Sequence, residues 1–299
     1  MNTTIERFLQ YLRHERNLSS RTVDLYRRDI EQWSDFMTSG SRPLDLATVT
    51  PGDIRYWLVN RARRGDKPST LRLALQALRA LYRYLLRQGM VTVNPAAAVE
   101  LAKLPKPLPS FVREKTVDAI LDADIDDDDF AQWRDRLIVM LLYETGIRRS
   151  ELIGLQDAAV DTGKRELKVH GKRDKDRIVP FGPELAQAID RYRVLRQAVS
   201  PQCGNLLVTA RGNPIYPSLV YHVVHDSLAA AGGTGKLSPH VLRHTFASVM
   251  LNHGAGLNSV KELLGHESLA ATQVYTHVTL SELQHNYELA HPRALKKGG

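Results

Sequence analysis

The 299-residue sequence has few of the features that mark secreted or membrane proteins. It contains a single cysteine, Cys203, so no disulfide can form within the chain and a reducing compartment is expected. Near the start, Glu6 and Arg7 interrupt any apolar run of the kind found in a signal peptide. No stretch approaches the ~18–20 apolar residues that a membrane-spanning helix needs. A cytoplasmic protein is therefore expected.

Positive charge is what the composition has in excess. Lys and Arg total 41 against 33 Asp and Glu, which gives a formal net charge of +8 at pH 7. These basic residues are spread along the chain rather than gathered in a tail. This distribution is typical of a folded protein with a basic face that binds nucleic acid, although a solvated basic surface has the same composition. The length fits about two domains.

The first 93 residues are predicted to form a helical domain. Apolar residues recur at helical spacing in four segments, which begin near residue 5, at Ser19 or Ser20, at Thr50-Pro51 and at Pro68-Ser69. The last segment carries arginines at spacings of four and seven, so that several share one flank: Arg72, Arg79, Arg83 and Arg87. This flank suits contact with a DNA phosphate backbone, although a solvated helix face shows the same pattern.

Proline and lysine then concentrate in residues 94–110 without helical continuity. Such a segment is typical of an extended linker, which divides the chain into an N-terminal domain, 1–93, and a C-terminal domain, 111–299. Two domains joined by a basic linker suit a clamp that closes around a rod-shaped ligand.

The second domain is predicted to be mainly helical with a small β-hairpin. Dense apolar residues predict a buried helix over 133–143, and further helices are expected at 183–196 and 217–230. Alternation predicts a strand at 166–170, with 177–180 as its partner across a turn that has lysines at its tip. The apolar run at 206–209 is also predicted to be a short strand. The acidic stretch 122–129 lacks the glycine and ligand spacing of a calcium loop, so a solvated loop is expected.

Histidines and an arginine recur near the C-terminus against an apolar helical pattern. Ser238-Pro239 marks a helix start, which places His240 in the first turn and Arg243 one turn later, where the N-terminal end of a helix favours an anion such as phosphate. His244 follows His240 at a spacing that can chelate zinc. However, Val241 replaces the glutamate of an H-E-x-x-H motif, and no cysteine or carboxylate completes a ligand set. No metal is expected, and His244 is predicted to be packed and hydrogen-bonded.

Gly265 is predicted to end a helix, which leaves His266 at the start of a turn. A further helix is expected to carry Tyr275. Taken alone, a tyrosine on a helix is far more often a core residue than a nucleophile.

Six residues in order resemble the motif set of the tyrosine recombinase (phage integrase) family. They are Arg148 in Gly-Ile-Arg-Arg-Ser-Glu-Leu, Lys172 on the hairpin, His240 and Arg243 in His-Val-Leu-Arg-His, His266 in Leu-Gly-His, and Tyr275 in Tyr-Thr-His. The resemblance covers essentially the whole chain, including a helical SAM-like core-binding domain. The compact length and the closing residues 290–294, Ala-His-Pro-Arg-Ala, are most similar to the bacterial Xer recombinases, of the XerC/XerD type.

The resemblance implies a two-domain, C-shaped DNA clamp that needs no metal or nucleotide cofactor. Arg148 and Arg243 would hold the non-bridging phosphate oxygens, and His266 would hydrogen-bond the phosphate. With His240 as general base, Tyr275 would attack phosphorus and form a 3′-phosphotyrosyl link.

Two further positions belong to this implied site. Lys172 would protonate the departing 5′-oxygen, and Glu151, one turn after Arg148, would support an active-site group; a surface charge is the alternative. Arg173 stands where the family has a glycine, so that Lys175, also a candidate DNA contact, becomes a rival general acid.

The implied partners are a duplex with a specific recombination site and three more protomers. The tetramer would contain this chain alone or with a paralogous recombinase, with a terminal helix over 280–289 docked on a neighbour or packed within its own chain. Resolution of chromosome dimers at cell division is the expected role, in the nucleoid and with a DNA translocase as a possible activator. The alternatives are a mobile-element integrase, a type IB topoisomerase and a DNA-binding protein that has lost catalysis.

Overall fold

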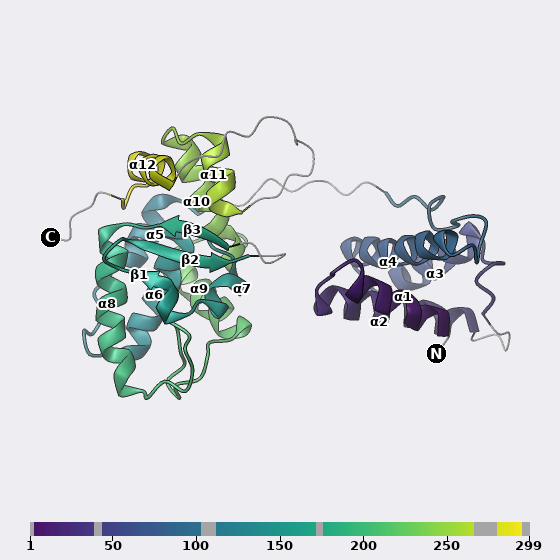
Figure 1. Cartoon of the computed structure of the whole chain (residues 1–299), viewed down its shortest axis with the longest axis horizontal. Coiled ribbons are helices and arrows are strands. Elements are labelled where there is room, and N and C mark those ends of the chain that lie inside the picture. Colours follow the sequence, from purple (N-terminus) through teal and green to yellow (C-terminus); the bar gives the residue numbers. More distant parts are fainter. Residues whose placement is uncertain (1–2, 39–43, 103–111, 172–175, 266–279, 295–299) are drawn as a thin grey trace. The chain divides into compact units, whose positions relative to one another are not determined.

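The computed structural model describes residues 3–38, 44–102, 112–171, 176–265 and 280–294. The chain divides into two compact units, Met1–Pro107 and Leu108–Gly299, each with its own hydrophobic core (Figure 1). Both units are mainly helical, and a small three-stranded sheet lies in the second, which confirms the predicted fold class. None of the helices in these described ranges is long and apolar enough to cross a membrane.

The described part of the first unit contains four helices, and the last three begin where the sequence predicts. They are α1 (Thr3–His14), α2 (Ser20–Thr38), α3 (Pro51–Arg63) and α4 (Pro68–Arg87). Thr50 forms a capping box with Asp53 in front of α3, with proline at the first helical position. The apolar stripes of these helices meet around the buried aromatic side chains of Trp33, Trp57 and Tyr82.

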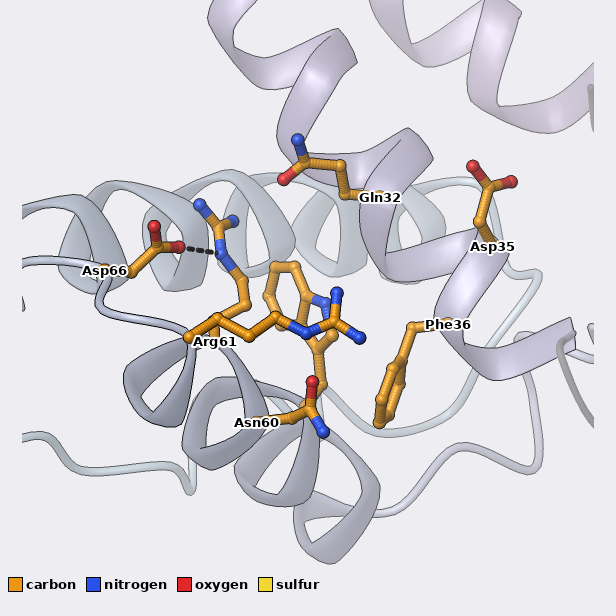
Figure 2. A pocket seen from close by; sticks show the side chains of 8 residues that line it. Gln32, Asp35, Phe36, Asn60, Arg61 and Asp66 are labelled. Atoms are coloured by element: carbon orange, nitrogen blue, oxygen red, sulfur yellow. Dashed lines mark hydrogen bonds and ion pairs between the residues drawn. The ribbon is translucent and has the colours of Figure 1, made fainter.

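A cavity of about 570 Å³ opens between α2 and the end of α3 (Figure 2). Arg61 lines it and lies over the Trp57 ring, with its guanidinium carbon 5.1 Å from the ring centroid. The same guanidinium is bonded to Asp66 and, at 3.0 Å, to the buried Asp29 of α2. The charge of Arg61 is therefore used to hold α2 against α3.

Residues 94–102, the first part of the expected linker, pack on the first unit. Ala96 and Val99 are completely buried. From α4, Arg79 donates to both of their carbonyls, through Nε at 3.0 Å and Nη2 at 2.7 Å. Arg72, also on α4, donates to the carbonyl of Ala102. This docking was not predicted because a proline-containing segment has no periodicity of its own, and its attachment depends on side chains of another element.

The second unit is built around a buried helix, α6 (Phe130–Thr145), in which every residue from 137 to 145 is buried. Asp129 closes the acidic loop and caps α6, accepting from the N–H groups of Ala131 and Gln132. Among the helices that contact α6 are α8 (Pro183–Ala198), α9 (Pro217–Ala230) and α10 (Pro239–Asn252). The unit also contains α5 (Glu114–Leu121), α7 (Arg149–Gly154), the 3-10 turn η1 (Asp157–Ala159), α11 (Leu257–Leu264) and α12 (Leu280–Ala290).

The sheet contains the predicted hairpin and a short third strand. β1 (Val160–Asp161), β2 (Glu166–His170) and β3 (Asp176–Pro180) are antiparallel in the order β1-β2-β3, with Val169 opposite Arg177. The prediction of a strand at 206–209 is wrong, because this segment forms only an isolated bridge between Val208 and Pro214. Proline has no N–H for a ladder, so the buried apolar run lines the core without joining the sheet.

The end of the described chain folds back on its own unit. α12 contacts α10, α11 and β3, as the intramolecular alternative for this helix requires (Figure 1). Beyond α12, the side chain of Arg293 is 4% exposed and is paired with three carboxylates: Glu184 at 2.7 Å, Asp122 at 2.7 Å and Asp118 at 3.2 Å.

Candidate active site

The first feature of the site is a glycine in the left-handed backbone conformation. Gly146 caps the end of α6 with φ 60° and ψ 18° and turns the chain into α7. A Cβ at this position would lie 2.4 Å from Cδ1 of Phe246, so both the backbone conformation and the close approach require glycine. The turn places Arg148 at the N-cap of α7.

Arg148 is held from two sides. Its Nη1 donates to Oε1 of Glu151 at 2.7 Å, and its backbone N–H donates to Oε2 of the same carboxylate at 2.7 Å. Its Nη2 donates to the carbonyl of Gly265 at 2.8 Å. The side chain of Glu151 is only 5% exposed and binds Arg148 directly, so it is not a free surface charge.

Arg243 comes from α10 and is buried in the same cluster. Its guanidinium donates to the carbonyls of Gly146 and Leu264. Burial and the positive charges of Arg148 and Arg177 lower the pKa of Arg243 to about 10, with the charge of Glu151 opposing them. The side chain therefore stays protonated at neutral pH while it lies out of water.

A third arginine, Arg177 on β3, was not predicted. Its Nε donates to the carbonyl of Leu263 at 2.8 Å, and its Nη1 and Nη2 bind the two oxygens of Glu151 at 3.0 and 2.9 Å. The strand pattern could have predicted this residue. Arg177 lies two residues before the buried Val179, so both side chains point to the inner face of the strand. A charged side chain on that face needs a partner.

The three arginines converge on one helix end. Arg177, Arg243 and Arg148 bind the successive carbonyls of Leu263, Leu264 and Gly265, where α11 ends in a left-handed glycine cap, as predicted. Carbonyls at the C-terminal end of a helix have no partner within the helix and carry partial negative charge, which favours cations. Burial alone would raise the pKa of Glu151, but hydrogen bonds from Arg177 and Arg148 hold it at about 2. Arg148 and Arg177 therefore share this carboxylate, whose charge also acts on Arg243, and positive charge remains in excess.

Two histidines lie on the exposed side of α10. His240 is exposed, and its pKa is lowered by partial burial and by the positive charges of Arg149, His244, Lys236 and Arg243. The neutral imidazole, which can accept a proton, is therefore favoured. The prediction that His244 is packed is wrong, because one helical turn after His240 it occupies the same exposed side.

The comparison with known families identifies the family of the chain. Residues 110–282 match the phage integrase family, and residues 5–89 match the N-terminal SAM-like domain of phage integrases. The chain belongs to the phage integrase family. The resemblance inferred from the motif residues is confirmed, and the chain is a site-specific recombinase that acts through a tyrosine nucleophile.

Curated relatives of this integrase are named tyrosine recombinase XerC. The protein of Chlorobaculum tepidum is 36% identical over 315 residues, which cover 96% of this chain and 94% of the relative. That of Listeria innocua is 36% identical over 293 residues, covering 97% of both, and that of Mycobacterium sp. strain JLS is 37% identical over 300 residues, covering 98% and 100%.

Solved structures share the integrase fold. XerH bound to its difH substrate before cleavage gives a TM-score of 0.68 at 19% identity, covering 89% of this chain and 79% of that one. A lambda integrase tetramer bound to a Holliday junction gives 0.66 at 18% identity, covering 91% and 79%. XerA recombinase is 29% identical with a TM-score of 0.50, covering 98% and 100%.

The structure of this integrase brings together part of the predicted site. Glu151 is hydrogen-bonded to Arg148 and Arg177, and Arg243 binds the same helix end through the carbonyl of Leu264. His240 lies at the margin of this cluster, where the charge of Arg243 acts on it. The other expected site residues lie outside the described residues: Lys172, Lys175, His266 and Tyr275. No group of three or more His, Cys, Asp or Glu in the described part of the integrase is arranged to hold a metal ion.

The arginines expected to contact DNA differ in their surroundings. Arg72 and Arg79 hold the 94–102 segment through its carbonyls, which the helical pattern did not predict. Arg83 is exposed on α4, where its Nε lies 3.4 Å from the carbonyl of Arg79 one turn earlier. Of these three side chains, Arg83 is the one whose described contacts stay within its own helix.

Proposed function

We propose that this integrase cuts and rejoins DNA at a specific site through a 3′-phosphotyrosyl intermediate, without a metal or nucleotide cofactor. The observation that carries the proposal is the cluster of Arg148, Arg177 and Arg243 at the end of α11, where the carboxylate of Glu151 binds two of them. A DNA phosphodiester resists nucleophiles because it is negatively charged. Fixed and partly buried guanidinium groups stabilise the charge that develops at phosphorus and need no reorganisation during the reaction.

Arg148 and Arg243 are the proposed phosphate ligands. Each guanidinium carries five N–H donors, and the described contacts of each occupy only two of its nitrogens, Nη1 and Nη2, with one protein acceptor apiece. Donors therefore remain on both side chains for the non-bridging oxygens, to which guanidinium binds with charge-assisted hydrogen bonds. His266 is proposed to add one more hydrogen bond to the phosphate.

The covalent step uses Tyr275, His240 and Lys172. The phenol oxygen of Tyr275 bonds to phosphorus and passes its proton to His240, whose lowered pKa keeps it neutral and able to accept. The bond from phosphorus to the 5′-oxygen breaks, and Lys172, with Lys175 as the alternative, supplies the proton of the new 5′-hydroxyl. The same steps in reverse rejoin the DNA strand, because the phosphotyrosyl link preserves the energy of the broken bond.

The proposed assembly is a tetramer on two duplexes. The lambda integrase relative is a tetramer on a Holliday junction, and the XerH relative is bound to a substrate DNA. Relatives named XerC over nearly the full chain support resolution of chromosome dimers as the role, alone or with a paralogous recombinase and a DNA translocase. Integration of a mobile element is the second candidate, because lambda integrase and a transposon integrase share the fold.

A substrate nicked near the cleavage site tests the chemistry. Loss of the short fragment prevents rejoining, so wild-type protein should accumulate a covalent adduct with DNA in the presence of EDTA. Tyr275→Phe should bind the same DNA and form no adduct. A strict requirement for a divalent metal, or an undiminished adduct with the variant, would refute the assignment.

The biological role needs a second experiment on the same adduct. Genomic fragments are incubated with the protein, and the DNA that becomes covalently attached is sequenced. A single chromosomal site would support resolution of chromosome dimers. Attachment at the ends of a mobile element would support the integrase alternative and overturn the chromosomal role.

A further inference from the structure

Arg177 is the residue of the cluster that the proposed chemistry leaves without a role. It lies on β3, its side chain is 13% exposed, and it binds a carboxylate whose side chain is 5% exposed. We infer that Arg177 is a positioning residue that acts through Glu151 to orient the guanidinium of Arg148 toward the scissile phosphate. This inference rests on the proposed function.

The sharing of the carboxylate is the first support. Oε1 of Glu151 accepts from Nη1 of Arg148 at 2.7 Å and from Nη1 of Arg177 at 3.0 Å. Oε2 accepts from the backbone N–H of Arg148 at 2.7 Å and from Nη2 of Arg177 at 2.9 Å. Each oxygen thus has one partner from each arginine. The planar fork of Arg177 sets the plane of the carboxylate, and that plane sets the direction of the bonds to Arg148.

The attachment to α11 is the second support. Nε of Arg177 donates to the carbonyl of Leu263, two residues before the carbonyl of Gly265 that Arg148 binds. The guanidinium also packs over Gly265, where an added Cβ would lie 3.2 Å from Nη1 of Arg177. One side chain therefore connects β3, α7 and the end of α11, and it fixes both elements that Arg148 contacts.

The occupied donors distinguish Arg177 from the proposed phosphate ligands. All three of its nitrogens donate to protein acceptors, whereas the described contacts of Arg148 and Arg243 use only Nη1 and Nη2. Without Arg177, the buried carboxylate would lose two of its four hydrogen bonds and could no longer hold Arg148 in one orientation. Arg177 therefore supports the reaction without touching the phosphate.

A neutral substrate separates positioning from general structural support. A methylphosphonate at the scissile position replaces one charged non-bridging oxygen by a methyl group, so the reaction depends less on arginine. Arg177→Met should slow adduct formation at saturating DNA about 10²-fold on the phosphodiester, since small misplacements of a reacting group have effects of this size. On the methylphosphonate, the loss relative to wild type should be below about 5-fold, and Arg148→Met should show the same selectivity. DNA affinity should change less than about 3-fold, because many other phosphate contacts contribute to binding.

Arg193→Met is the matched control. Arg193 on α8 also joins a carboxylate to backbone carbonyls, with bonds of 2.8 Å to Oδ1 of Asp157 and 3.1 and 2.9 Å to the carbonyls of Asp157 and Val160. Its loss should lower stability without discriminating between the two substrates. If Arg177→Met does not fold, Arg177→Lys keeps the charge but not the fork, and it should show a smaller loss with the same selectivity.

A double variant tests whether Arg177 acts through Glu151. Glu151→Gln combined with Arg177→Met should be no slower than the slower single variant, because both remove the same link. Equal losses on the two substrates, multiplied losses in the double variant, or a normal rate with Arg177→Met would each overturn the positioning role. Failure of wild-type protein to form the Tyr275 adduct would instead refute the proposed function itself.

Discussion

Arg148 and Gly265 are 117 positions apart, yet Nη2 of Arg148 lies 2.8 Å from the carbonyl oxygen of Gly265. This contact brings the turn after α6 to the end of α11, immediately before His266 in the sequence. Arg243 makes the same connection from α10, through the carbonyls of Gly146 and Leu264. The phosphate site proposed above therefore exists only when three separate helix ends are packed together.

Replacement of Arg243 should affect cleavage far more than binding. Arg243→Ala removes a proposed phosphate ligand, and adduct formation should fall about 10³-fold, as for other groups that stabilise a transition-state charge. DNA affinity, measured by electrophoretic mobility shift, should weaken less than about 10-fold because other phosphate contacts remain. Arg243→Lys keeps the charge but cannot serve two carbonyls and a phosphate, so it should recover only part of the rate. Equal losses of binding and cleavage would argue against the role.

The acid side of the pH–rate profile should report His240. Its pKa lies below the usual 6.5, so the neutral base persists as the pH falls, and cleavage should be lost only below pH 6.5. The measurement is the rate of adduct formation at subsaturating DNA, which reflects groups in the free enzyme. His240→Asn should be slow at every pH and lack this acid limb. An unchanged acid limb in the variant would assign it to another group.

Gly146→Ala should destabilise the second unit. The added Cβ would meet Phe246 and Leu264 at 2.4 and 2.9 Å, and φ is +60°. Overpacking and left-handed strain together should lower the free energy of unfolding by about 2–4 kcal/mol. Gly154→Ala is the control, because nothing lies within 4 Å of its Cβ position, and it should change stability by less than about 1 kcal/mol. Urea denaturation of the full chain, followed by circular dichroism, measures both.

The arginines of α4 should separate into two kinds. Arg83→Ala should weaken DNA binding and reduce its salt dependence without changing stability, since Arg83 is exposed. Arg79→Ala should also lower the free energy of unfolding by about 1–3 kcal/mol, because the carbonyls of Ala96 and Val99 lose their partner. Mobility shifts at several salt concentrations, together with urea denaturation, distinguish the two. Normal DNA binding by Arg83→Ala would contradict its proposed contact.

Glu144 should make the stability depend on pH. It is fully buried at the end of α6, and burial raises its pKa to about 8, with the charge of Arg293 opposing the shift. Between about pH 4.5 and pH 8, the folded protein holds a proton that the unfolded chain releases, so this group lowers stability as the pH rises. The free energy of unfolding of Glu144→Gln, measured relative to wild type, should therefore increase by on the order of 2–4 kcal/mol from pH 5 to pH 8. Urea denaturation of both proteins at several pH values measures the difference.

The sequence by itself determined the longer helices of both units and the residues that carry the family resemblance. Caps such as Thr50-Pro51 and Ser238-Pro239, and the apolar spacing of each helix, act over four residues or fewer, so they can be read locally. Alternation likewise predicted the hairpin of β2 and β3. The strand expected at 206–209 failed because an apolar run indicates burial but not whether a partner strand exists.

Only the tertiary structure decided how the arginines are used. Arg177, Arg243 and Arg148 bind the carbonyls of residues 263–265, and Arg79 binds those of Ala96 and Val99. Every residue has a backbone carbonyl, so such an acceptor leaves no trace in the amino-acid sequence. The choice among carbonyls depends on which chain segments lie within reach once the cores are packed. That is why the pattern predicted Arg148 with Glu151, three positions apart, but not the contact of Glu151 with Arg177 from a different element.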